Sequence, residues 1–144
     1  MIPGKLQDLL ETFDMFTDPM DRSSMLLSYA DQFREVPPDV ATRPFDGNHH
    51  VPQCESDAYA WAVKMPDDTL KLYFAVENPS GVSAKALAAI LDRTLSGLPA
   101  REVAQVSPDI VERIFRQNIS MGKGMGLMSM VHAVQTLAKA AERS

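Results

Sequence analysis

The chain has 144 residues, of which 45% are hydrophobic and 23% charged, with a formal net charge of -5. This size and balance are typical of one globular domain with one core, and the scattered lysine and arginine residues argue against a nucleic-acid partner. No apolar stretch approaches the roughly 20 residues of a membrane helix, and the first residues lack the apolar core of a signal peptide. With a single cysteine in the chain, we expect a protein of the reducing cytoplasm that binds no membrane.

Two helices are predicted at the N-terminus. Apolar residues at helical spacing predict the first helix over about residues 4–16. Asp18 and Pro19 are the residue types preferred at an N-cap and at the first helical position, so a second helix starts there and runs to about Glu35. Four prolines within residues 37–53 then predict an irregular, extended connector.

A change from helical to alternating periodicity predicts an antiparallel hairpin. Large and small side chains alternate over residues 58–65, and a second alternation follows over residues 70–76. The residues between these runs have turn composition, which favours a hairpin. Residues 46–52 are a candidate for a third strand at its edge.

The remainder of the chain is predicted to be helical. Ser83 is the expected N-cap of a helix that ends at Gly97, and residues 99–106 form a short helix or a turn. Another helix starts at residues 107–109. The glycine-rich residues 122–126 are expected to form a flexible lead into a last, apolar helix.

This order of elements predicts an α+β fold. Two helices precede the hairpin and several follow it. Because a small antiparallel sheet must bury its apolar face, helices packed on that face are the natural arrangement. We therefore expect a single domain over residues 1–144, in which a small antiparallel sheet packs against several helices.

Cys54 lies in the segment that is richest in chemically versatile side chains, between two histidines and Ser56. The thiolate is the nucleophilic form, and a free cysteine has a pKa of about 8.5. A position in a loop just before a strand favours a reactive thiol. A small buried hydrophobic residue is the alternative, and the residues alone leave both open.

Other kinds of site have weaker support. His49 and His50 could join Cys54 in a zinc site, but no CxxC or HxxxH spacing supplies the remaining ligands, so we expect no metal. A Cys-His-Asp hydrolase would need His132, which falls among apolar residues of the last helix. The glycine-rich stretch lacks the spacing of a phosphate-binding loop, and the methionines around it fill the core or form a pliable surface.

Two segments resemble the SufE family. Val51-Pro52-Gln53-Cys54-Glu55-Ser56 is similar to its sulfur-acceptor motif, Val-x-(Gly/Glu)-Cys-(Gln/Thr)-(Ser/Thr), which a strand follows. The segment from Ser120 to Leu127 is similar to the family's Ser-Pro-x-Arg-x-x-Gly-Leu/Met, and the order of elements fits the family as well. Gln53, Glu55 and Lys123 depart from the pattern; a lysine keeps the charge of arginine but loses its fork geometry.

The resemblance implies a sulfur-transfer function. A pyridoxal-phosphate cysteine desulfurase would hand persulfide sulfur to Cys54, and an iron–sulfur scaffold protein would receive it. The pyridoxal phosphate would belong to the partner, so no cofactor is expected on this chain. The resemblance also implies a monomer or homodimer whose cysteine is sheltered until the partner exposes it. A SufE-like binding module that regulates a desulfurase without efficient transfer is the alternative.

His50 and Lys123 are candidates for supporting roles because a positive charge near Cys54 would lower the pKa of its thiol. The presence of a single cysteine in the chain also suits a sulfur carrier. With no resolving thiol in the chain, a persulfide on Cys54 cannot collapse to an internal disulfide.

Overall fold

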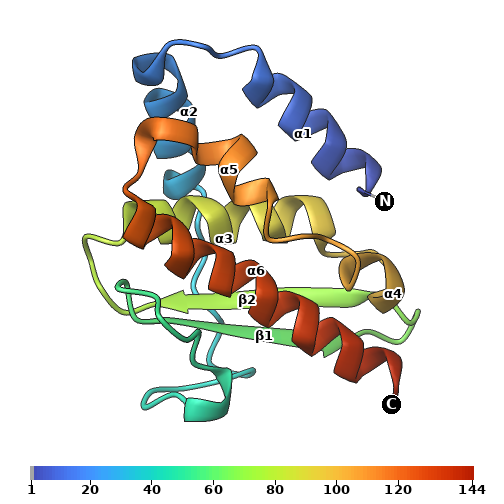
Figure 1. The fold of residues 1–144 in the computed structure, drawn as a ribbon. Helices are drawn as coiled ribbons and strands as arrows, with labels where there is room; N and C mark the ends of the chain where they lie inside the picture. Colours follow the sequence, from blue (N-terminus) through green and yellow to red (C-terminus); the bar gives the residue numbers. More distant parts are fainter. Residues whose placement is uncertain (1) are drawn as a thin grey trace.

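A two-stranded antiparallel hairpin forms the sheet, and helices cover one of its faces (Figure 1). The computed structural model describes residues 2–144. Strands β1 (Ala58–Lys64) and β2 (Leu70–Val76) pair in a register that sets Trp61 opposite Tyr73. The predicted α+β fold and its hairpin are confirmed. Within residues 2–144, no helix combines the length and the apolarity that crossing a bilayer requires.

The two faces of the hairpin pack against different partners. Ala58 and Ala60 lie in the main core, on the face where helix α6 (Met121–Glu142) packs against β1. The large rings of Tyr59 and Trp61 occupy the opposite face and pack against Phe45 of the connector, with ring centroids 5.1 and 5.2 Å apart. Alanine side chains are short, so the strand offers α6 a surface that the helix can approach closely.

The first two helices are α1 (Gly4–Asp14) and α2 (Pro19–Asp31). The predicted cap at Asp18 is confirmed, since its side chain accepts a hydrogen bond of 2.9 Å from the backbone N–H of Met20. The predicted end at Glu35 is wrong, because α2 stops at Asp31.

A contact with the sheet explains the early end of α2. The backbone N–H of Val36 donates to the carbonyl of Phe74 at 2.9 Å, and Glu35 forms a parallel bridge with the same residue. This pairing needs extended backbone, which a helix continuing to Glu35 would not provide.

The third strand expected over residues 46–52 is reduced to one bridge. A 3-10 turn, η1 (Gly47–His49), occupies the segment, and Asp46 caps it by accepting from Asn48 N–H at 2.8 Å. In the part of the chain that is described, the pairing of this segment with β1 consists of a single antiparallel bridge from His50 to Tyr59. The local turn therefore competes successfully with strand formation.

Helix α3 (Val82–Leu95) begins before Ser83, the residue that was expected to be its N-cap. The N-cap is Gly81 rather than Ser83. Because glycine has no side chain, it makes no side-chain capping hydrogen bond. A Cβ at Gly81 would lie 2.8 Å from Val76 Cγ1 and 2.9 Å from Ser56. Close packing against the loop before β1 thus decides where α3 begins.

Three short helical elements, α4 (Ala100–Val103), α5 (Ile110–Phe115) and η2 (Arg116–Asn118), then lead to α6. The short helix expected within residues 99–106 is confirmed. The flexible lead expected over residues 122–126 is wrong, because α6 already begins at Met121 and includes all of these glycines.

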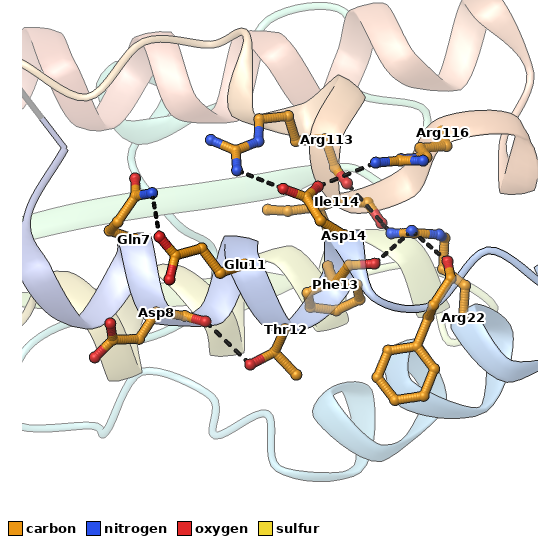
Figure 2. Close-up of polar contacts among 11 residues, drawn as sticks. Gln7, Asp8, Glu11, Thr12, Phe13, Asp14, Arg22, Arg113, Ile114 and Arg116 are labelled. Carbon is orange, nitrogen blue, oxygen red and sulfur yellow. Dashed lines mark hydrogen bonds and ion pairs between the residues drawn. The ribbon is translucent and has the colours of Figure 1, made fainter.

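A buried arginine joins three of the helices (Figure 2). The side chain of Arg22 on α2 is 2% exposed. It donates to the carbonyls of Phe13 and Phe16 at 2.6 and 2.7 Å, and to those of Ile114 and Arg113 at 2.8 and 3.2 Å. Three of these carbonyls lie in the last turns of α1 and α5, where helix carbonyls lack their i+4 donors, and the carbonyl of Phe16 lies just after α1.

A second contact supports the same junction. Asp14 accepts from Arg113 at 2.7 Å and from Arg116 at 3.0 Å (Figure 2). The hydrogen bond from Arg113 lowers the pKa of the Asp14 carboxyl, so the contact is retained at neutral pH and is lost as the pH falls through that lowered value.

We expect Arg22→Leu to lower the free energy of unfolding by at least about 3 kcal/mol, because it removes the donors of several buried carbonyls. Arg34→Leu at an exposed position of the same chain is the control and should change stability by less than about 0.5 kcal/mol. Urea unfolding followed by circular dichroism measures both values. Equal effects of the two substitutions would show that Arg22 does not join these helices.

Candidate functional site

Cys54 lies at the centre of a tight loop between the connector and β1. The backbone of the loop is left-handed at Gln53 (φ 62°) and again at Asp57 (φ 54°). Between these two positions the N–H of Asp57 donates to the carbonyl of Cys54 at 3.1 Å. Left-handed backbone is uncommon for residues other than glycine, so the surroundings must hold this loop in shape.

The second half of the loop is held by the segment that leaves β2. Asn78 N–H donates to the carbonyl of Ser56, and Glu77 N–H donates to that of Asp57, both at 3.1 Å. The loop therefore lies beside the start of α3, although the two segments are more than twenty residues apart in the chain.

Helix α6 holds the first half of the loop. A Cβ added at Gly126 would lie 2.8 Å from the carbonyl oxygen of Gln53 and 3.2 Å from the Cα of Cys54. Both distances are too short for an unstrained contact with backbone atoms. Only a glycine at this position lets α6 approach the loop so closely.

A cavity of about 150 Å³ opens where the loop, α3 and α6 meet. Cys54 is half-buried and is one of the residues that line it. Polar and apolar residues line the cavity together, among them three serines and one lysine. Its polar lining residues are Glu55, Ser56, Asn78, Ser80, Ser83 and Lys123.

The structure brings together two of the three predicted site residues. Lys123, in the first turn of α6, lines the same cavity as Cys54. Its place in the helix is set by Ser120, whose hydroxyl accepts from Lys123 N–H at 3.2 Å. Lys123 and the only cysteine of the chain thus line one cavity.

His50 is directed elsewhere. Its Nε2 donates to the Oδ1 of Asp57 at 2.7 Å, and it is not among the residues that line the Cys54 cavity. His49 donates from Nδ1 to the carbonyl of Ala60 at 2.9 Å and stacks on Trp61. Both histidines therefore have partners other than the thiol.

The zinc and hydrolase arrangements gain no geometric support. His132 lines a separate cavity of about 240 Å³ together with His49 and His50, and Cys54 does not line it. Across residues 2–144, no three His, Cys, Asp or Glu side chains are grouped so that they could hold a metal ion.

The sequence analysis missed two glycines and several polar residues of the site. Gly126 matches the glycine of the family segment near the C-terminus, a signal that pointed to this position but not to its role. Gly81 follows Asn78-Pro79-Ser80, whose residue types indicate a turn after the sheet but no contact with Cys54. The contact of this turn with the Cys54 loop depends on the three-dimensional path of β2 and had no signal in the spacing.

Comparison with known proteins identifies the family. The family model described as "SufE: Fe-S metabolism associated domain" matches residues 7–138. The chain belongs to the SufE family. A SufE-like protein 1 from Arabidopsis thaliana, described as chloroplastic/mitochondrial, is 26% identical over 138 residues, which is 95% of this chain and 35% of that protein. The present SufE chain thus spans about a third of this relative.

A solved structure agrees with the family assignment. The solution structure of a hypothetical protein from Thermus thermophilus matches this SufE chain with a TM-score of 0.78 and 27% sequence identity. The match covers 100% of both chains. The predicted SufE-like fold is therefore confirmed.

We expect Gly126→Ala to lower the free energy of unfolding by about 1–3 kcal/mol, because its methyl group must displace the Gln53 carbonyl. Gly124→Ala is the matched control, since a Cβ there lies 3.5 Å from Ile119 Cδ1, an ordinary contact. This control should be as stable as the original protein or up to about 1 kcal/mol more stable, because alanine favours helix. Urea unfolding measures both, and equal stabilisation by both substitutions would contradict the close approach of α6 to the loop.

Proposed function

We propose that this protein accepts sulfur on Cys54 from the persulfide of a cysteine desulfurase and passes it to an iron–sulfur cluster scaffold. One observation carries the proposal: the only thiol of the chain lines a cavity beside a lysine, in a protein whose family is associated with Fe-S metabolism. The solitude of Cys54 supports the same interpretation, because a carrier persulfide needs protection from a second thiol. The reducing cytoplasm is the compartment that we propose.

The transfer step is a thiol exchange. The thiolate of Cys54 attacks the terminal sulfur of the desulfurase persulfide. The sulfur–sulfur bond of the donor breaks, and the donor cysteine leaves as a thiolate. Cys54 then carries the transferred sulfur and its proton as Cys54-S-SH, so that no external oxidant or reductant is needed.

The lining of the cavity suits this step. Lys123 lines the cavity with Cys54, so its side chain is available to bind the negatively charged sulfur of an arriving persulfide. The serine hydroxyls along the wall can donate hydrogen bonds to the same group. No step on this chain requires a cofactor, and the pyridoxal phosphate that releases sulfur from L-cysteine belongs to the desulfurase.

A regulator that binds a desulfurase without efficient transfer is the second candidate. Glu55 is the observation in its favour, because this residue lines the cavity of Cys54 and places a negative charge where the family motif has Gln or Thr, which would repel an anionic persulfide. Gln53 is a second departure, since it precedes the cysteine where the family motif has Gly or Glu, and its backbone is left-handed (φ 62°).

We expect the protein to increase sulfide release by a cysteine desulfurase that turns over L-cysteine with a thiol reductant. Cys54→Ser should abolish the increase, because the hydroxyl cannot accept sulfur. Lys123→Ala should reduce it roughly threefold or more, because the cavity loses the positive charge that would bind the arriving anionic sulfur. The measurement is the initial rate of sulfide production at a fixed desulfurase concentration.

Lys139→Ala supplies the control, since Lys139 is an exposed lysine on the same helix that does not line the cavity. Its rate should equal that of the original protein. Full stimulation by Cys54→Ser would contradict sulfur transfer through this thiol and would favour the regulator.

A further inference from the structure

One side-chain contact joins the two ends of the loop that carries Cys54. His50 precedes the loop and Asp57 ends it, and the Nε2 and Oδ1 atoms of the two lie 2.7 Å apart. Both residues are anchored to the sheet edge. His50 forms the bridge with Tyr59 and packs edge-on against its ring at 5.1 Å, whereas Asp57 accepts a backbone bond from Glu77.

This contact adds to the backbone hydrogen bonds that hold the second half of the loop. Gln53 and Asp57, on either side of Cys54, are both left-handed. Conformations of this kind persist where the surroundings over-determine them. The close approach of Gly126 restrains Gln53. The bond from His50 adds a side-chain restraint on Asp57 to the backbone bonds that Asp57 makes with Cys54 and Glu77.

We propose that His50 and Asp57 form a clasp that keeps the Cys54 loop closed against α6 and limits access to the thiol. His50 is then a positioning residue, which acts on Cys54 through the loop backbone rather than by placing charge beside the sulfur. The clasp rests on the proposed function for its purpose, since a sulfur acceptor needs a thiol that is guarded until its partner arrives.

The exposure of the clasp agrees with this purpose. The side chains of His50 and Asp57 are 38% and 54% exposed, and solvent-exposed pairs contribute little to stability. A weak clasp at the surface can be opened by a docking protein at small cost. A buried ion pair in this place would hold the loop shut against the partner as well.

Alkylation of Cys54 by iodoacetamide in the full chain tests the clasp without any partner. We expect His50→Ala to raise the alkylation rate about two- to fivefold, the range that an exposed pair allows. Asp57→Gly should raise it as well, and glycine retains the left-handed backbone at this position. His49→Ala is the matched control, because its ring bonds to Ala60 rather than to the loop, and its rate should be unchanged.

The double variant decides whether the two residues act together. If the clasp exists, His50→Ala has no further effect on the alkylation rate in the Asp57→Gly background. An unchanged rate in His50→Ala, or the same increase in both backgrounds, would overturn the proposal. Urea unfolding of each variant shows that the fold is retained while these rates are compared.

The alkylation rates are independent of the test of sulfur transfer. Iodoacetamide reports access to the thiol and needs no desulfurase. A protein that transfers sulfur but shows no coupling between His50 and Asp57 would lack the clasp alone. A protein that shows the coupling but no transfer would keep the clasp and lose the proposed function.

Discussion

The close approach of α6 to the Cys54 loop at Gly126 is the constraint on which the rest of the site depends. The approach is possible because β1 presents alanines to the helix and because Gly126 has no side chain to strike the Gln53 carbonyl. It places Lys123, three residues earlier on α6, in the wall of the cavity that Cys54 lines. A second glycine, Gly81, lets the start of α3 complete that wall from the other side.

Local patterns predicted much of the fold. Alternation identified both strands of the hairpin, and the Asp18–Pro19 pair identified the start of α2. The predictions that failed concern positions whose backbone conformation is determined by contacts with residues distant in the sequence. Glu35 forms a bridge with β2 where a helix was expected, and Gly126 lies within α6 where that helix packs against the Cys54 loop. Glycine has a low helix propensity, so no local signal could have predicted that the glycines of α6 are helical.

The residues of the site were likewise predictable only in part. The motif around Cys54 and the segment with Lys123 pointed to two residues that meet at one cavity, although they lie far apart in the chain. His50 was expected to act on the thiol because it is near in sequence, yet its ring is bound to Asp57. That partner follows from the left-handed turn at the end of the loop, which the residue types did not indicate.

In the proposed mechanism, Cys54 itself receives the sulfur. Mass spectrometry of the protein after incubation with a cysteine desulfurase and L-cysteine tests this step most directly. We expect the peptide containing Cys54 to gain about 32 Da, the mass of one sulfur atom, and to lose it again on treatment with a reducing thiol. A Cys54 peptide of unchanged mass, obtained while the desulfurase carries its own persulfide and turns over, would contradict the mechanism.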